Sequence, residues 1–311
     1  MRPSTQGSAM TETILATSPS VNEKDRSLTG EALALLARSP MVWVALAILA
    51  VLFVMAFAPQ LFSSVDPRYC DLMKARKPPE PGHWFGFDIQ GCDVFSRTIH
   101  GASASLSVSF LATIGSTLIG GIVGLIAGFY GGSTDAVLSR VTDVVLGLPT
   151  LLGAIVILAT LGSAQDSGMV WPIVRLALVL SILGWATEAR LMRASVLQTK
   201  QAEYVRAARA AGAGNGWIAI RHVLPNSMAP LLVMATLSLG GYVGTEATLS
   251  YLGLGLQAPV ISWGTAISDA QPYLSSAPHM LVFPSLFLIV TVLALVLLGE
   301  AVRRAFDPRS R

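Results

Sequence analysis

Charged side chains are scarce in this sequence: only 13% of its 311 residues are Asp, Glu, Lys or Arg, against about 25% in typical soluble domains. Hydrophobic residues make up 53% of the chain and are concentrated in blocks. So few charges cannot cover the surface of a water-soluble fold, and so many apolar residues are incompatible with a disordered chain. The composition therefore excludes both classes and indicates an integral membrane protein.

Catalytic motifs are also missing from the sequence. It contains no H-E-x-x-H, no G-x-S-x-G and no G-x-x-x-x-G-K-[ST]. None of its four lysines follows a glycine, so the chain has no Walker A loop with which to hold nucleotide phosphates. We therefore predict no catalytic residue and no ATPase site in this chain, and no cofactor bound to it.

Six apolar stretches are long enough to cross a bilayer core, which takes about 20 apolar residues in an α-helix. Gly and Pro interrupt several of them, and membrane helices tolerate this because neighbouring helices satisfy the freed backbone groups. The sequence predicts an all-α integral membrane protein with six transmembrane helices, over residues 41–58, 106–129, 136–161, 171–191, 228–249 and 280–299.

Lys and Arg are distributed unequally between the two sides of these spans. Fifteen of the 21 lie on the side that carries both termini and the loop 192–227, and six lie on the other side. The positive-inside rule therefore predicts that both termini and this loop are cytoplasmic. The net charge is +3, but the basic residues form no stripe of the kind that binds nucleic acid. Their placement is explained by membrane orientation, and we predict no nucleic-acid partner.

The spans also suggest how the chain is divided. We expect a mobile cytoplasmic tail over residues 1–27, which are rich in polar types, and a short interfacial helix over 28–39. Residues 40–105 hold the first span, expected to be a retained signal anchor, and an extracytoplasmic segment. A five-helix core covers 106–306, with the cytoplasmic loop 192–227 inside it, and 307–311 form a cytoplasmic C-terminus.

Some residues inside the spans are candidates for packing or for a pathway. Gly120 and its neighbours at a spacing of four share one helix face, which we expect to pack within this chain. Ionisable groups in membrane spans are functional candidates. The positions we consider for a pathway or a gate are Glu246, Asp143 and the helix-interrupting Pro149. Most ionisable groups here lie near span ends, which favours anchoring over a proton relay.

The loop before the fifth span has a distinctive pattern. Residues 203–211 are rich in Ala and predict a short helix, a break follows over 212–216, and a second helix ends near Pro225. Exposed helices around a rigid break are suited to docking in a groove on another protein, but an ordinary solvated loop has the same composition.

This loop resembles the signature of inner-membrane permease subunits of ATP-binding-cassette importers, which reads E-A-A, three residues, G, nine residues, I-x-L-P. Arg206 stands where the signature has Glu, and His222 stands where it has Ile. The stretch 221–226, which ends at Asn226, is similar to the form in dipeptide and oligopeptide permeases. The residues on the register of the signature are Ala207, Ala208, Gly212, Leu224 and Pro225.

Other stretches resemble the C-type subunit of dipeptide, oligopeptide and nickel importers. Residues 86–88 and 91–97 resemble its G-T-D…G-R-D-V-x-S-R motif, and 128–132 resemble its G-Y-Y-G-G turn. Residues 249–255 and 262–264 resemble L-S-F-L-G-L-G…S-W-G. The ending 307–309 also fits, so the similarity runs from about residue 38 to residue 309, nearly the whole chain.

The resemblance implies the type I importer permease fold in the bacterial inner membrane. It implies that residues 203–226, which begin at Glu203, couple the spans to one or two cytoplasmic ATPase subunits, which bind ATP and Mg. A second, homologous B-type permease subunit and an extracytoplasmic substrate-binding protein complete the implied complex in the lipid bilayer. The implied substrates are dipeptides or oligopeptides, with nickel, glutathione or haem as alternatives. For the function itself, the alternative from a different class is a proton-coupled secondary transporter.

The two cysteines, Cys70 and Cys92, both lie in the expected extracytoplasmic segment, where disulfides persist. We favour a bridge between them. Two free thiols are one alternative. A metal site with His83 and His100 is another, but that spacing matches no strong zinc signature and we predict no metal site.

Overall fold

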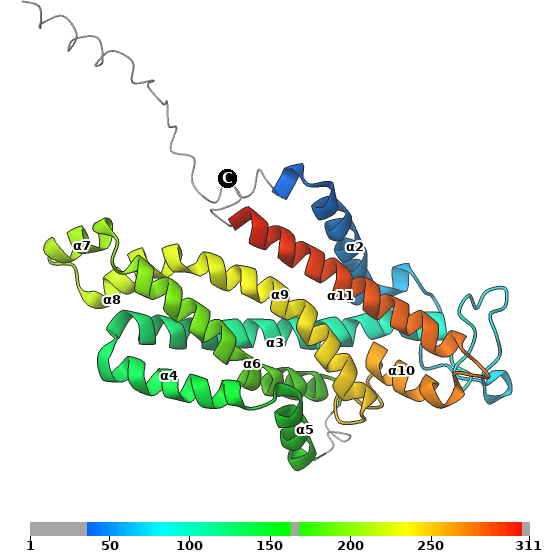
Figure 1. Ribbon diagram of the computed structural model, residues 1–311. Helices are drawn as coiled ribbons and strands as arrows, with labels where there is room; N and C mark the ends of the chain where they lie inside the picture. The colour runs from blue at the N-terminus through cyan, green and yellow to red at the C-terminus, as the bar shows by residue number, and fades with distance from the viewer. Residues whose placement is uncertain (1–35, 163–167, 307–311) are drawn as a thin grey trace, which may run out of the picture.

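Long helices aligned along one direction make up most of the protein (Figure 1). The computed structural model describes residues 36–162 and 168–306. The expected tail 1–27, most of the expected interfacial helix 28–39 and the C-terminus 307–311 lie outside the described residues. Within these described ranges, five helices are long and apolar enough to cross a membrane. They are α2 (Pro40–Phe57), α3 (Val94–Tyr130), α6 (Val170–Thr199), α9 (Leu224–Tyr251) and α11 (His279–Phe306).

These five helices confirm five of the six predicted spans, but the third span is not one straight helix. Helices α4 (Gly132–Gly147) and α5 (Thr150–Leu161) meet at an angle of 85°. Proline disfavours helical geometry in the residue before it, and Leu148 is accordingly extended, with φ −84° and ψ 125°. Pro149 therefore breaks the expected helix, and the structure has a sixth span only if this bent pair is counted as one.

Helix α3 begins well before the predicted second span, at Val94. Asp93 caps it, because one carboxylate oxygen accepts the backbone N–H of Ser96 at 2.7 Å. At 1.5 Å per residue a helix of 37 residues is about 55 Å long, which exceeds the roughly 30 Å of a bilayer core. Helix α3 is therefore longer than crossing the apolar core requires. Four short elements were not predicted: η1 (Pro59–Leu61), η2 (Leu72–Lys74), α10 (Trp263–Ala270) and η4 (Gln271–Tyr273).

Helices α3 and α6 pack closely along the glycine stripe of α3. A Cβ atom added at Gly120 would lie 2.7 Å from the carbonyl oxygen of Trp185. One added at Gly124 would lie 2.5 Å from the carbonyl oxygen of Ala189, and Gly128 faces α6 in the same way. The stripe therefore packs within this chain, as expected, because only glycine allows the two backbones to come this close.

Two irregular regions lie at opposite ends of the helix bundle (Figure 1). One is the 203–226 segment, which contains α7 (Glu203–Ala210) and α8 (Asn215–Ile218). The other is the 59–93 segment between α2 and α3, in which Cys70 and Cys92 form a disulfide. The candidate sites lie in these two regions.

Candidate functional site

Helix α7 ends in a Schellman motif built around Gly212. The backbone N–H of Ala213 donates to the carbonyl of Ala208 at 3.1 Å, and that of Gly212 donates to Arg209 at 3.0 Å. Gly212 has φ +83°, the left-handed conformation that this motif requires and that favours glycine. The predicted break of the first helix is therefore confirmed, and it has a defined geometry.

The second half of the segment differs from the prediction. Helix α8 does not end near Pro225: it continues through a π-helical turn, Ala219–Val223, directly into α9. Pro225 lies directly after the π-helical turn, in the first residues of α9, and does not end the helix. The side chain of Asn226 donates to the carbonyl of His222 at 2.7 Å across this junction. The segment is therefore continuous with a membrane-spanning helix.

A buried apolar cluster fixes the 203–226 segment to the ends of α3, α6 and α9. Val205, Ile218 and Val223 are fully buried in this cluster, and Ala208 and Ala213 pack against it. Because these anchors lie in both halves of the segment, a force applied to its exposed face reaches three long helices. The other buried members are Phe129, Met192, Val196, Ala219 and Leu231.

The opposite face of the segment is exposed and partly apolar. The exposed fraction is 54% for Trp217 and 66% for Ile220, and Tyr204 is also exposed. The Trp217 ring packs edge-on against His222, with 4.8 Å between the ring centroids. Exposed Trp, Tyr and Arg side chains are typical of protein interfaces, and this face also presents the exposed residues Glu203, Arg206, Ala207, Arg209 and Arg221.

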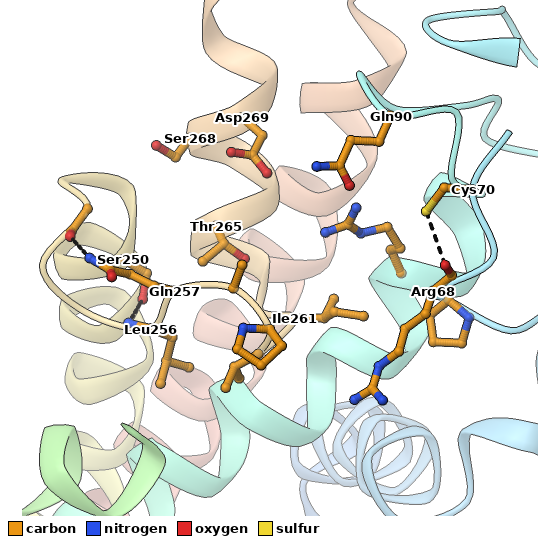
Figure 2. A pocket seen from close by; sticks show the side chains of 16 residues that line it. Arg68, Cys70, Gln90, Ser250, Leu256, Gln257, Ile261, Thr265, Ser268 and Asp269 are labelled. Carbon is orange, nitrogen blue, oxygen red and sulfur yellow. Dashed lines mark hydrogen bonds between the residues drawn. The ribbon is translucent and has the colours of Figure 1, made fainter. Parts of the chain in front are cut away.

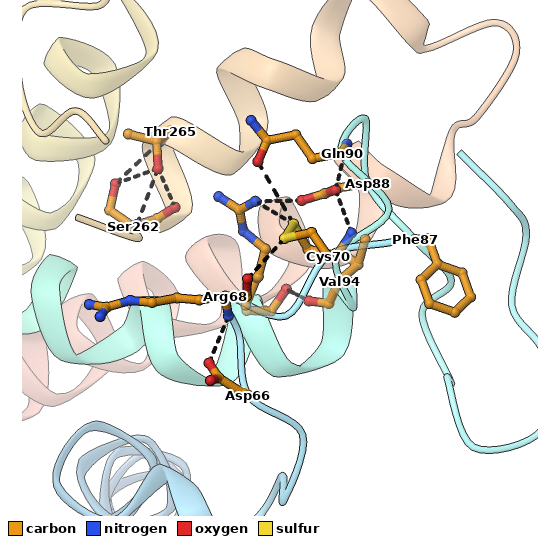
Figure 3. A network of polar contacts seen from close by, with 12 residues as sticks. Asp66, Arg68, Cys70, Phe87, Asp88, Gln90, Val94, Ser262 and Thr265 are labelled. Atoms are coloured by element: carbon orange, nitrogen blue, oxygen red, sulfur yellow. Dashed lines mark hydrogen bonds and ion pairs between the residues drawn. A yellow bond between two sulfur atoms is a disulfide. The ribbon is translucent and has the colours of Figure 1, made fainter. Parts of the chain in front are cut away.

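The 59–93 segment is held together by the Cys70–Cys92 disulfide and a polar network (Figure 3). Arg97 donates to a carboxylate oxygen of Asp88 at 2.5 Å and contacts the Cys92 sulfur at 3.4 Å. The other oxygen of Asp88 accepts the backbone N–H groups of Gln90 and Cys92 at 2.8 and 2.9 Å. Within the part of the chain that the structure describes, no group of three His, Cys, Asp or Glu side chains is arranged to hold a metal.

The three pathway or gating candidates lie in different environments. Asp143 forms an exposed ion pair with Arg190 at 2.8 Å and lines a cavity of about 310 Å³ between α3, α4 and α6. Pro149 lies at the bend between α4 and α5. Glu246 is fully buried in α9: one carboxylate oxygen accepts from the Ser250 hydroxyl at 2.8 Å, and the other has no partner among the described residues. The structure does not bring these three residues together.

A second buried carboxyl group, Glu188 of α6, links three helices. One of its oxygens accepts hydroxyl hydrogen bonds from Ser116 of α3 at 3.2 Å and from Ser238 of α9 at 3.0 Å. The sequence does not single out Glu188 among the ionisable residues of the spans. Its partners are 72 and 50 residues away along the chain, so no local pattern indicates them.

The apolar helix bundle and the anchored 203–226 segment, exposed on one face, define a multi-pass membrane protein with an exposed helical segment at one end. Residues 120–311 match the family described as "Binding-protein-dependent transport system inner membrane component". The oligopeptide transport system permease protein OppC of Bacillus subtilis (strain 168) is 36% identical over 291 residues, which cover 94% of this chain and 93% of that protein.

The dipeptide transport system permease protein DppC of Alkalihalophilus pseudofirmus (strain ATCC BAA-2126 / JCM 17055 / OF4) is 37% identical over 257 residues, which cover 82% of this chain and 81% of that protein. A solved structure described as "Inward facing conformations of the MetNI methionine ABC transporter" shares the fold: its TM-score is 0.53 at 18% identity, with 68% of this chain and 96% of that chain covered. This chain therefore belongs to the family of binding-protein-dependent transport system inner membrane components, as a permease of the OppC/DppC type.

Proposed function

We propose that this chain is one of two permease subunits of an ATP-driven importer of dipeptides or oligopeptides in the bacterial inner membrane. The observation that carries the proposal is the 203–226 segment, whose exposed face is ready to dock while its buried face is fixed to the long helices. The sequence has no Walker A loop, so an ATP-driven mechanism requires a separate ATPase subunit. The relatives named for oligopeptide and dipeptide transport favour peptides as the substrate class.

The way the 203–226 segment is packed suggests how closure of an ATPase subunit is transmitted to the membrane-spanning helices. One or two ATPase subunits, carrying ATP and Mg, bind the face around Trp217 on the cytoplasmic side. Their closure pushes on Val205, Ile218 and Val223, which are packed against α3, α6 and α9. A ligand shifts a conformational equilibrium only by its difference in affinity for the two states. ATP and the loaded substrate-binding protein must therefore each favour a different packing of the helices of this chain and its B-type partner.

Co-purification tests the docking step. We take Trp217 as the aromatic hot spot of this face. Truncating a hot-spot residue costs about 2 kcal/mol or more, so Trp217→Ala should weaken binding of the ATPase subunit by about thirtyfold. The matched control is Trp84→Ala in the 59–93 segment, which lies at the other end of the bundle; the exposed fraction of Trp84 is 75%. Equal recovery of the ATPase subunit with both variants and wild type would show that the face around Trp217 is not the docking surface.

A further inference from the structure

A cavity of about 350 Å³ lies at the disulfide end of the bundle (Figure 2). The 59–93 segment and the first turns of α3 form one side of it, and the α9–α10 connection with α10 forms the other. This volume is within the range of about 300–1,000 Å³ that small-molecule sites occupy. The cavity is far from the 203–226 segment and is not explained by docking of an ATPase subunit.

Asp269 and Arg68, two side chains of opposite charge, line this cavity and form no ion pair with any residue in the described part of the chain. The carboxylate of Asp269 makes no hydrogen bond or ion pair with any residue that the structure describes. The guanidinium of Arg68 contacts only the Met169 sulfur, at 2.6 Å, among the described residues. The two side chains lie on different sides of the cavity in Figure 2, so they do not neutralise each other.

The electrostatic surroundings of Asp269 favour a bound cation. Desolvation by the surrounding protein raises the pKa of Asp269, the charge of Arg97 opposes this rise, and Asp88 adds to it. Arg97 is itself committed to Asp88, with 2.5 Å between the charged atoms. A bound ammonium group would therefore supply the counter-charge that Asp269 lacks in the described structure.

The walls of the cavity are held in place before any ligand binds. The disulfide of Cys70 fixes one wall, and the Ser250 hydroxyl accepts the backbone N–H of Leu256 at 2.9 Å in the other. The Gln257 side chain donates to the carbonyl of Gly253. Between these polar groups lie apolar side chains, which include Leu256 and Val260. A preorganised cavity with opposed charges and an apolar wall fits a ligand that carries the same features.

We propose that this cavity is a reception subsite for a short peptide, in which Asp269 binds the α-ammonium group and Arg68 binds the α-carboxylate. The apolar wall at Leu256 and Val260 then faces a side chain of the peptide. This inference rests on the proposed function, since it deepens the substrate class named there. It gives the permease its own preference for free termini, in addition to any preference of the binding protein.

The experiment compares uptake of labelled trialanine with uptake of its N-acetylated and C-amidated forms. The complete complex is reconstituted in proteoliposomes, and the same binding protein, saturated with each peptide, is used throughout. Asp269→Asn should slow uptake of trialanine about tenfold, equivalent to about 1.4 kcal/mol, and leave uptake of the N-acetylated form unchanged. Arg68→Gln should likewise slow uptake of trialanine about tenfold and leave uptake of the C-amidated form unchanged.

The control variants lie in the 59–93 segment, as Arg68 does, but their side chains do not line the cavity. Glu80→Gln and Arg76→Gln remove a charge of each sign, and both should leave all three uptake rates at wild-type values. Equal slowing of all three peptides by Asp269→Asn would indicate a defect in folding or in docking of the binding protein, and would overturn the inference. Unchanged rates would overturn it too. If the wild-type complex with ATP moves no trialanine at all, it is the proposed function that fails.

Discussion

Substitutions at Gly212 separate two roles of this glycine: ending a helix and contacting a partner. Gly212 has φ +83°, and a Cβ atom added there meets no atom within 4 Å in this chain. A substitution therefore strains the backbone but clashes with nothing in the described chain. Alanine in this conformation costs about 1 kcal/mol, whereas Asn and Asp adopt it more readily because their side chains bond locally.

The two roles predict opposite orders of damage. If Gly212 only ends α7, Ala should be the most harmful substitution, and Asn and Asp should be close to wild type. If an ATPase subunit covers Gly212, added volume decides, so Gly212→Asp and Gly212→Asn should uncouple ATP hydrolysis from uptake more than Gly212→Ala does. We expect the second order, with Gly212→Asp losing most uptake while membrane insertion and delivery by the binding protein remain intact.

The assay measures peptide uptake and substrate-stimulated ATPase activity of the assembled complex in the same proteoliposomes. The ratio of peptide imported to ATP hydrolysed reports coupling independently of the amount of complex. Wild-type coupling in the Gly212→Asp complex would refute the reasoning, because a charged side chain at a force-bearing contact cannot be neutral.

Three further predictions concern other parts of the molecule. Cys70 and Cys92 should resist alkylation in the denatured, non-reduced protein, and reduction should destabilise the segment by about 3 kcal/mol; alkylation of both without reduction would rule out the bridge. Gly124→Ala should lower the free energy of unfolding of the complex by about 1–3 kcal/mol, measured as a lower melting temperature, because the added Cβ would lie 2.5 Å from the Ala189 carbonyl oxygen. The control Gly244→Ala, with nothing within 4 Å, should be neutral, and an equal loss would contradict the packing argument. The purified chain alone should bind no MgATP by calorimetry, and saturable binding would contradict the absence of a nucleotide site.

Much of the fold follows from local patterns that the sequence displays directly. Long apolar runs predicted six spans, and five of them are single helices in the structure, because crossing a bilayer imposes both length and composition. The Ala-rich stretch followed by Gly212 predicted a helix and its end, since the Schellman motif depends on residues within one turn. The bend at Pro149 could also have been predicted from a local pattern, because proline disfavours a helical residue before it. Hydropathy alone does not distinguish a straight span from a broken one.

The candidate sites were less accessible because their parts come from distant stretches. The hydroxyl partners of Glu188 come from two other helices, and the cavity at Arg68 and Asp269 joins the 59–93 segment to α10. A signal for Asp269 was available: it is the only Asp, Glu, Lys or Arg between Glu246 and Glu300. A single charge in so apolar a stretch needs a reason, but the sequence does not say which basic residue faces the same cavity.

The most direct test of the central claim is peptide uptake by defined combinations of subunits. Proteoliposomes hold this chain alone, this chain with its partner permease, or the complete complex with ATPase subunits and binding protein. Uptake of labelled trialanine is measured with MgATP, without nucleotide, and with a proton gradient in place of ATP. We predict uptake only by the complete complex and only with MgATP. Uptake by the chain alone, or uptake driven by the proton gradient without ATP, would contradict the claim that a separate ATPase drives this permease.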